Sequence, residues 1–147
     1  MRGFSLVEVL VVIVILGLML SIVVGSFSSS SGLNGPVEQA LTVFSDARNR
    51  TIAGRDLSQF GVHIEADRLT LFKGTSFTAG AAGNEVSLFD SSVEVVNVAL
   101  TGGASDVIFK RLRGDTLQSG SFVIRLKNNN AVSKTITIGT AGIVSAN

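Results

Sequence analysis

The stretch FSLVEVLVVIVILGLMLSIVV, residues 4–24, decides how this chain is organised. Its only charged side chain is Glu8, and its only other polar residues are Ser5 and Ser21. As a helix rising about 1.5 Å per residue it would be roughly 31 Å long, close to the ~30 Å hydrocarbon core of a bilayer. Apolar residues would cover all sides of that helix, which favours immersion in lipid or burial among other helices. We therefore predict a transmembrane or filament-core helix over residues 4–25.

The basic residues around this stretch predict its orientation. Arg2 precedes it, and no basic residue follows until Arg48. Because positive charges beside a span stay on the cytoplasmic side, we expect a single-pass protein with a cytoplasmic N-terminus and a periplasmic or extracellular remainder. The alternative is a Sec-exported β-rich protein with a cleaved signal peptide. Signal peptides usually have an apolar region of only about 7 to 15 residues, however, and Gly25-Ser26-Phe27 is a mediocre cleavage site.

Glu8 is the unusual residue of the apolar stretch. An acidic side chain in hydrocarbon costs on the order of 2.5 to 3.5 kcal/mol, so a carboxylate at this place indicates a function. The plainer alternative is a first-turn residue that reaches the cytoplasmic headgroups.

The residues Gly3-Phe4-Ser5-Leu6-Val7-Glu8, behind a very short basic leader, resemble the processing signal of type IV prepilins and type II secretion pseudopilins. The resemblance implies that a prepilin peptidase cuts between Gly3 and Phe4, removes the leader of residues 1–3, and leaves Phe4 N-methylated. It implies a structural subunit of a type IV pilus or type II secretion pseudopilus. The implied partners are other pilin or pseudopilin subunits, the peptidase, an inner-membrane assembly platform and membrane lipid.

The chemistry of the residues agrees with this resemblance. Cleavage would create an amine at Phe4, about one helical turn from Glu8. A buried carboxylate is tolerated when it meets a cation, and parallel copies displaced along a filament axis would each offer one. We therefore assign Glu8 an assembly role, in which it pairs with the Phe4 amine of a neighbouring subunit.

Two segments with different composition follow the apolar stretch. Residues 26–36, SFSSSSGLNGP, are rich in Ser and Gly and predict a linker of flexible or broken backbone. Residues 37–53 place their apolar side chains on one side at a period of 3.6, which predicts an amphipathic helix packed on a sheet. Arg48 intrudes on that apolar side; an ion pair or a contact to another subunit would explain it, and we expect the ion pair.

The apolar period changes to about 2 beyond Gly54, which predicts strands separated by Gly, Asn and Asp turns. One helix followed by short antiparallel strands indicates an α+β head domain over residues 37–147, β-rich from 60 to 145. The helix, FGVHI, RLTLFKG and the terminal TITIGTAGIV also resemble the heads of H-type pseudopilins and FimT-like minor pilins. The expected strands are 60–64, 68–73, 85–89, 93–100, 107–111, 121–126, 132–138 and 142–145.

The residue types leave little room for catalysis or metal binding. The chain has no Cys, which excludes disulfides and thiol chemistry, so we expect its C-terminal region to be held by strand pairing alone. Its single His63 alternates with apolar residues and is expected at the surface. Asp106, Asp115 and Asn128–Asn130 are explained better as turn residues than as calcium ligands. We expect no enzyme, no metal and no cofactor.

The last third of the chain is basic and suggests one further alternative. Residues 101–147 contain six basic and two acidic side chains. Such a patch could meet phosphates, and FimT-like minor pilins that bind DNA resemble it, which gives a DNA-binding minor pilin as a second possibility. Against it, no Tyr or Trp is present for base stacking. The possible DNA contacts are Lys110, Arg111, Arg113, Arg125, Lys127 and Lys134.

Overall fold

The computed structural model describes residues 6–26 and 31–147, and it describes side chains for residues 6–17 and 32–147. The chain divides into two compact units between Gly32 and Leu33. The expected leader, the cleavage and methylation site at Gly3 and Phe4, and residues 27–30 of the expected linker lie outside the described residues.

The first unit contains the helix α1, Leu6–Ser26. Branched and long aliphatic residues fill it, and no proline interrupts the chain before Pro36. Its side chains are described only as far as Gly17, so much of the expected membrane segment lies outside the described side chains. Among the described residues, no helix has both the length and the apolar character needed to cross a membrane.

The second unit contains all but the first two residues of the helix α2, Ser31–Ile52, which starts six residues before the expected Val37. Residues 31–36 of the expected linker are therefore helical. Leu33 is buried and lies four residues before the buried Val37, on the same side of the helix. Its packing outweighs the weak helix propensity of Gly32 and Gly35 and the hydrogen bond that Pro36 cannot make. The helix ends before Gly54, which has a left-handed φ of 65°.

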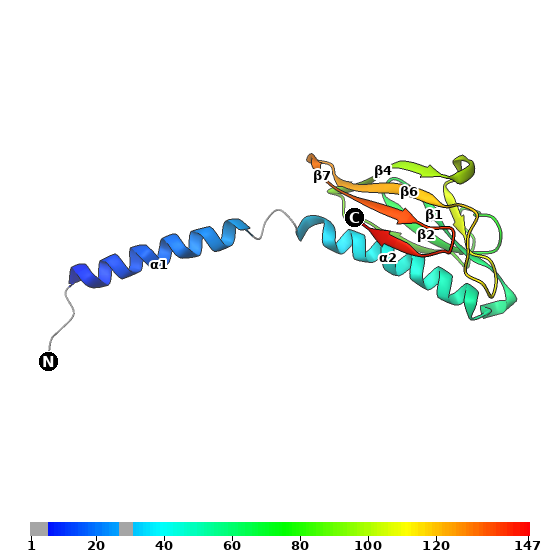
Figure 1. Ribbon diagram of the computed structural model, residues 1–147, viewed down its shortest axis with the longest axis horizontal. Helices are drawn as coiled ribbons and strands as arrows, with labels where there is room; N and C mark the ends of the chain where they lie inside the picture. The colour runs from blue at the N-terminus through cyan, green and yellow to red at the C-terminus, as the bar shows by residue number, and fades with distance from the viewer. Residues whose placement is uncertain (1–5, 27–30) are drawn as a thin grey trace. The chain divides into compact units, whose positions relative to one another are not determined.

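Two antiparallel four-stranded sheets complete the head and lie along α2 (Figure 1). The strands of the first sheet are ordered β3-β2-β1-β5 and those of the second β4-β6-β7-β8. Together with one helix they form the α+β head that the sequence predicts. The strands are β1 Phe60–Ile64, β2 Arg68–Lys73, β3 Glu85–Leu88, β4 Val93–Leu100, β5 Asp106–Ile108, β6 Gly120–Leu126, β7 Asn129–Ile138 and β8 Val144–Ala146.

All eight expected strands are present, and the largest differences from their expected bounds are at turns. Strand β5 ends three residues early because Lys110 turns the chain: its N–H donates to the Asp115 carbonyl, 2.8 Å away. Strand β7 starts three residues early because Leu126 pairs directly with Asn129. A two-residue turn, Lys127 and Asn128, closes this hairpin instead of the expected three asparagines.

One apolar core joins α2 to both sheets. The Phe44 and Phe122 rings lie 5.9 Å apart between centroids, which fixes α2 against β6. Burial of a large apolar side chain contributes roughly 1.5 to 3 kcal/mol, so this core stabilises the head. Its fully buried members include Ala40, Phe44 and Ala47 of α2, Val62 and Leu69 of the first sheet, and Phe122, Ile124 and Ile136 of the second.

Candidate functional site

The described surface of α1 is apolar and uncovered. Every side chain described on this helix is exposed, and Leu6 and Val7 keep 81% and 67% of their surface. Each such side chain gains roughly 1.5 to 3 kcal/mol when it is buried, so a helix of this kind demands an apolar cover. Lipid or other apolar helices would supply one.

Glu8 lies in the first turn of α1, on this apolar surface. It shares one side of the helix with Val9, Val12 and Ile13. A nearby cation would stabilise a carboxylate among aliphatic side chains when the helix is covered, because the cover removes its water. Its pairing with the Phe4 amine stays a prediction, since Phe4 is not among the described residues.

The six basic residues proposed for DNA contact lie at different places on the head. Lys110, Arg111 and Arg113 lie in the loop between β5 and β6, at the Gly120 end of β6. Lys127 lies beyond the Leu126 end, where its ammonium group donates to the Ser91 carbonyl. Six residue steps along β6 separate the two ends, which is about 20 Å at roughly 3.4 Å per step.

The remaining two residues of that set lie on opposite faces of the second sheet. Lys134 is paired with Ile124, whose side chain is buried in the core, whereas Arg125 is paired with Ser133. Because cross-strand partners share a face and successive residues alternate, Arg125 and Lys134 point to opposite sides. The structure therefore does not bring the six residues together on one surface.

Several of these cations are also engaged within the head. Arg125 pairs with Glu94 at 2.6 Å. Lys110 and Arg113 both contact Asp115, each at 3.2 Å. Burial alone would raise the pKa of Asp115, but the Lys110 hydrogen bond and the Arg113 charge outweigh it and hold that pKa below its ordinary range.

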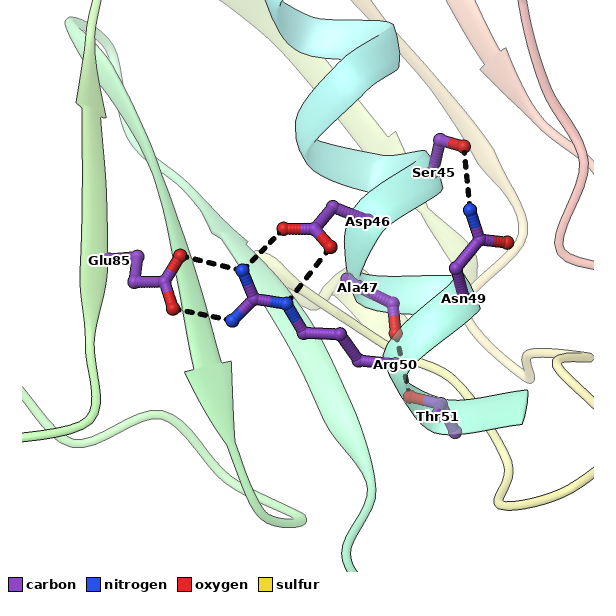
Figure 2. Close-up of polar contacts among 7 residues, drawn as sticks. All are labelled: Ser45, Asp46, Ala47, Asn49, Arg50, Thr51 and Glu85. Carbon is purple, nitrogen blue, oxygen red and sulfur yellow. Dashed lines mark hydrogen bonds and ion pairs between the residues drawn. The ribbon is translucent and has the colours of Figure 1, made fainter. Parts of the chain in front are cut away.

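Arg50 forms an ion-pair network that joins α2 to the edge strand β3 (Figure 2). Its guanidinium donates to both Asp46 carboxylate oxygens, at 2.9 and 2.6 Å, and to Glu85. The Glu85 and Asp46 hydrogen bonds raise the pKa of Arg50, and the Arg50 hydrogen bond lowers the pKa of Glu85. The four-residue spacing of Asp46 and Arg50 could have predicted their contact, but nothing in the sequence marks Glu85.

His63 differs from its expected place at the surface. It is half-buried on β1, its Nδ1 contacts Asp106 of β5, and its ring stacks on Phe77 at 3.9 Å between centroids. The segment between β2 and β3, which contains Phe77, covers this face of the first sheet. The alternation of residues along β1 correctly predicts that His63 faces away from the core, but it cannot show that a loop covers it.

Arg48 makes no ion pair with the described residues, so the expected ion pair is wrong. Its Nε donates to the Gly114 carbonyl at 3.2 Å. The C-terminal region is therefore held by more than strand pairing: Arg48 reaches across from α2, and the Thr116 N–H donates to the Thr140 carbonyl at 3.0 Å. Backbone carbonyls carry no sequence signal, which is why this arrangement could not be predicted.

No metal centre is apparent in residues 6–26 and 31–147, where no three His, Asp or Glu side chains gather as ligands. Asp115 contacts Lys110 and Arg113, and Asp106 contacts His63, so both carboxylates are engaged by side chains of the head.

Comparison with known proteins gives one match to a protein-family model and one match to a solved structure. Residues 1–24 match the prokaryotic N-terminal methylation motif. The structure is similar to the crystal structure of the type IV minor pilin FimU of Pseudomonas aeruginosa strain PAO1, with a TM-score of 0.57 and 13% identity over 75% of this chain and 88% of that one. No curated protein sequence matches the chain. The chain therefore carries a prokaryotic N-terminal methylation motif over residues 1–24, and its fold is similar to that of FimU.

Proposed function

We propose that the chain is a structural subunit of a type IV pilus or a type II secretion pseudopilus, anchored and assembled through α1. The observation that carries this proposal is the exposed apolar surface of α1 with its single carboxylate. Such a helix is unstable in water alone, but it suits lipid before assembly and a bundle of like helices afterwards.

The proposal includes processing at the N-terminus. Prepilin peptidase cuts between Gly3 and Phe4, and the methylated Phe4 becomes the first residue. The Glu8 carboxylate then pairs with the Phe4 amine of a neighbouring subunit, which favours one axial register between parallel helices. The methylation motif over residues 1–24 supports the proposed processing of the N-terminus.

The substitution Glu8→Leu tests the assembly role. We expect the variant to be inserted and cleaved like the wild type but to be lost from filaments sheared from the cell surface. Immunoblotting of the cells and of the sheared filaments measures this. Val12→Leu is the matched control, because it changes the same side of α1 and keeps the carboxylate. Normal recovery of Glu8→Leu in filaments would contradict the assembly role.

Mass spectrometry of the mature N-terminus tests the processing step and separates the exported-protein alternative. A methylated Phe4 supports the pilin pathway, whereas a chain that begins at or near Ser26 would show that the apolar stretch is a discarded signal peptide.

The DNA-binding alternative has weaker support. The six basic residues lie on separate surfaces, and three of them are engaged with Glu94 or Asp115. We therefore do not extend the proposed function to DNA uptake.

A further inference from the structure

A pocket of about 180 Å³ opens between α2 and the segment that leads into β8. Its walls are Leu41 and Ser45 of α2 and Gly142, Ile143 and Val144 of the C-terminal region, and Arg48 lines it as well. Ile143 keeps most of its surface exposed, and Ser45 is also exposed. Solvent exposure of aliphatic side chains beside a cation is unfavourable, so the pocket is suited to contact with another molecule.

Two glycines leave room for the Arg48 guanidinium. A Cβ on either Gly114 or Gly142 would come within 3.2 Å of the Arg48 Nε, so both positions leave room for this side chain. The Nε donates to the Gly114 carbonyl. Its two terminal nitrogens have no hydrogen bond or ion pair with the described part of the chain. Arg48 thus presents a fixed pair of donors, the geometry that binds a carboxylate with two parallel hydrogen bonds.

The carboxylates of the head identify a candidate to fill this pocket. Ten of the 11 acidic residues lie beyond α1. Eight of these form ion pairs within the head, and Asp90 accepts hydrogen bonds from the Ser92 N–H and hydroxyl. Glu38 is left: its side chain is exposed and has no partner among the described residues. The eight paired residues are Asp46, Asp56, Glu65, Asp67, Glu85, Glu94, Asp106 and Asp115.

Arg48 and Glu38 cannot meet within one copy. They are ten residues apart on α2, which separates them by about 15 Å along the helix axis and by roughly 80° around it. The cation in the pocket and the carboxylate on an adjacent side of the same helix could therefore pair with each other only between copies.

We propose that the Arg48 pocket of one copy binds Glu38 of a second copy. The two copies would lie parallel and be displaced by about 15 Å along α2. Each copy would use Arg48 toward one neighbour and Glu38 toward the other. Such a heterologous contact does not close on itself and builds an open filament. This inference rests on the proposed function, because it names a contact between the heads of assembled subunits.

Charge reversal in the full-length chain tests the pairing. Glu38→Arg and Arg48→Glu should each lower recovery in sheared filaments by about tenfold, since loss of one partner of a buried ion pair weakens an interface strongly. The double variant with both changes restores opposite charges and should recover most of the wild-type amount. A double variant no better than the two single ones would overturn the pairing.

Cross-linking provides a second measurement that leaves Arg48 intact. Because the chain has no Cys, single cysteines can be placed without background. Cells that co-express Glu38→Cys and Ser45→Cys copies should give a dimer with a short bis-maleimide, whereas Ser45→Cys alone should not. Val98→Cys, exposed on β4, is the matched control for Ser45→Cys. Equal dimer yields with Val98→Cys and Ser45→Cys would contradict the proposed contact.

The two proposals fail in different ways. If the wild-type chain never enters filaments, the proposed function fails. If the wild type enters filaments and the single charge reversals enter them equally well, only the Arg48–Glu38 contact fails.

Discussion

At the scale of single residues, the backbone of two exposed leucines is the least expected feature. Leu57 and Leu112 have φ values of 53° and 62°, in the left-handed region, and keep 77% and 66% of their surface exposed. A left-handed residue with a Cβ costs roughly 1 to 2 kcal/mol. Because both leucine side chains are largely exposed, their burial offsets little of that cost. At Leu112 a long-range hydrogen bond accompanies this conformation, from its N–H to the Thr51 carbonyl at 3.2 Å.

We expect Leu112→Gly to stabilise the head. Glycine removes the left-handed strain, and after its greater entropy in the unfolded chain is subtracted, about 0.5 to 1 kcal/mol of stability should remain. Thermal unfolding of the full chain in detergent, followed by circular dichroism, should show a Tm higher by a few degrees. Leu117→Gly is the control, because Leu117 is also 66% exposed but has no positive φ. An equal rise in both variants would show that strain is not the cause.

Glu85 gives the head a dependence on pH. The Arg50 hydrogen bond lowers the pKa of Glu85 below its ordinary 4.5, so its contribution to stability is present above that value. The contribution is lost as the pH falls through the lower pKa of the folded state. Because the Glu85 side chain is more than half exposed, solvent and salt weaken the effect.

We expect Glu85→Gln to lose less stability than the wild type between pH 6 and about pH 3. Urea unfolding at both pH values measures this difference. Glu38→Gln is the control, since Glu38 has no partner among the described residues of a single copy. If Glu85→Gln lost as much stability as the wild type over this pH range, the Arg50 network would not stabilise the fold.

At the scale of elements, the turn between β7 and β8 is held by close glycine contacts. A Cβ at Gly142, whose φ is 73°, would come within 1.9 Å of the Gly114 carbonyl oxygen. Backbone cannot yield as a flexible side chain can, so only glycine fits here. The close approach of these two loops places Arg48 against the Gly114 carbonyl and forms the floor of the Arg48 pocket.

We expect Gly142→Ala to destabilise the head by roughly 3 kcal/mol, from left-handed strain and displacement of the turn together. Gly80→Ala is the control, because Gly80 has a similar φ of 74° but open space around it, and should cost about 1 kcal/mol. Chemical denaturation of the two variants measures the difference. Equal losses would show that the contact with Gly114 has no energetic weight.

The elements themselves could be predicted well because their periods differ. Residues 37–53 repeat at 3.6 and the strands at about 2, and both patterns follow from which side chains are buried. The errors lie where tertiary contacts decide. Leu33 extends α2 through burial against the sheets, and a hydrogen bond between Lys110 and Asp115 ends β5 early, and neither has a local signal.

At the scale of the whole molecule, the methylation motif over residues 1–24 confirms the resemblance at the N-terminus, and the likeness to the FimU structure confirms the α+β class. The candidate site was predicted only in part. Glu8 is conspicuous in sequence because a lone charge interrupts an apolar run. The Arg48 pocket is not conspicuous in the sequence, because its lining residues come from positions 41 to 144 and because it depends on two particular backbone conformations. The separation of the basic residues likewise depends on strand register, which composition does not contain.

The alignment of α2 with the sheets has a mechanical consequence. Gln39 contacts Leu88 near one end of β3 and Arg50 contacts Glu85 at the other, so this strand runs alongside the helix. Hydrogen bonds between strands lie across the strand direction. Tension entering the head through the start of α2 would therefore load many of these bonds at once, in shear, instead of peeling them apart one after another. A head built this way resists pulling along the helix better than pulling across it.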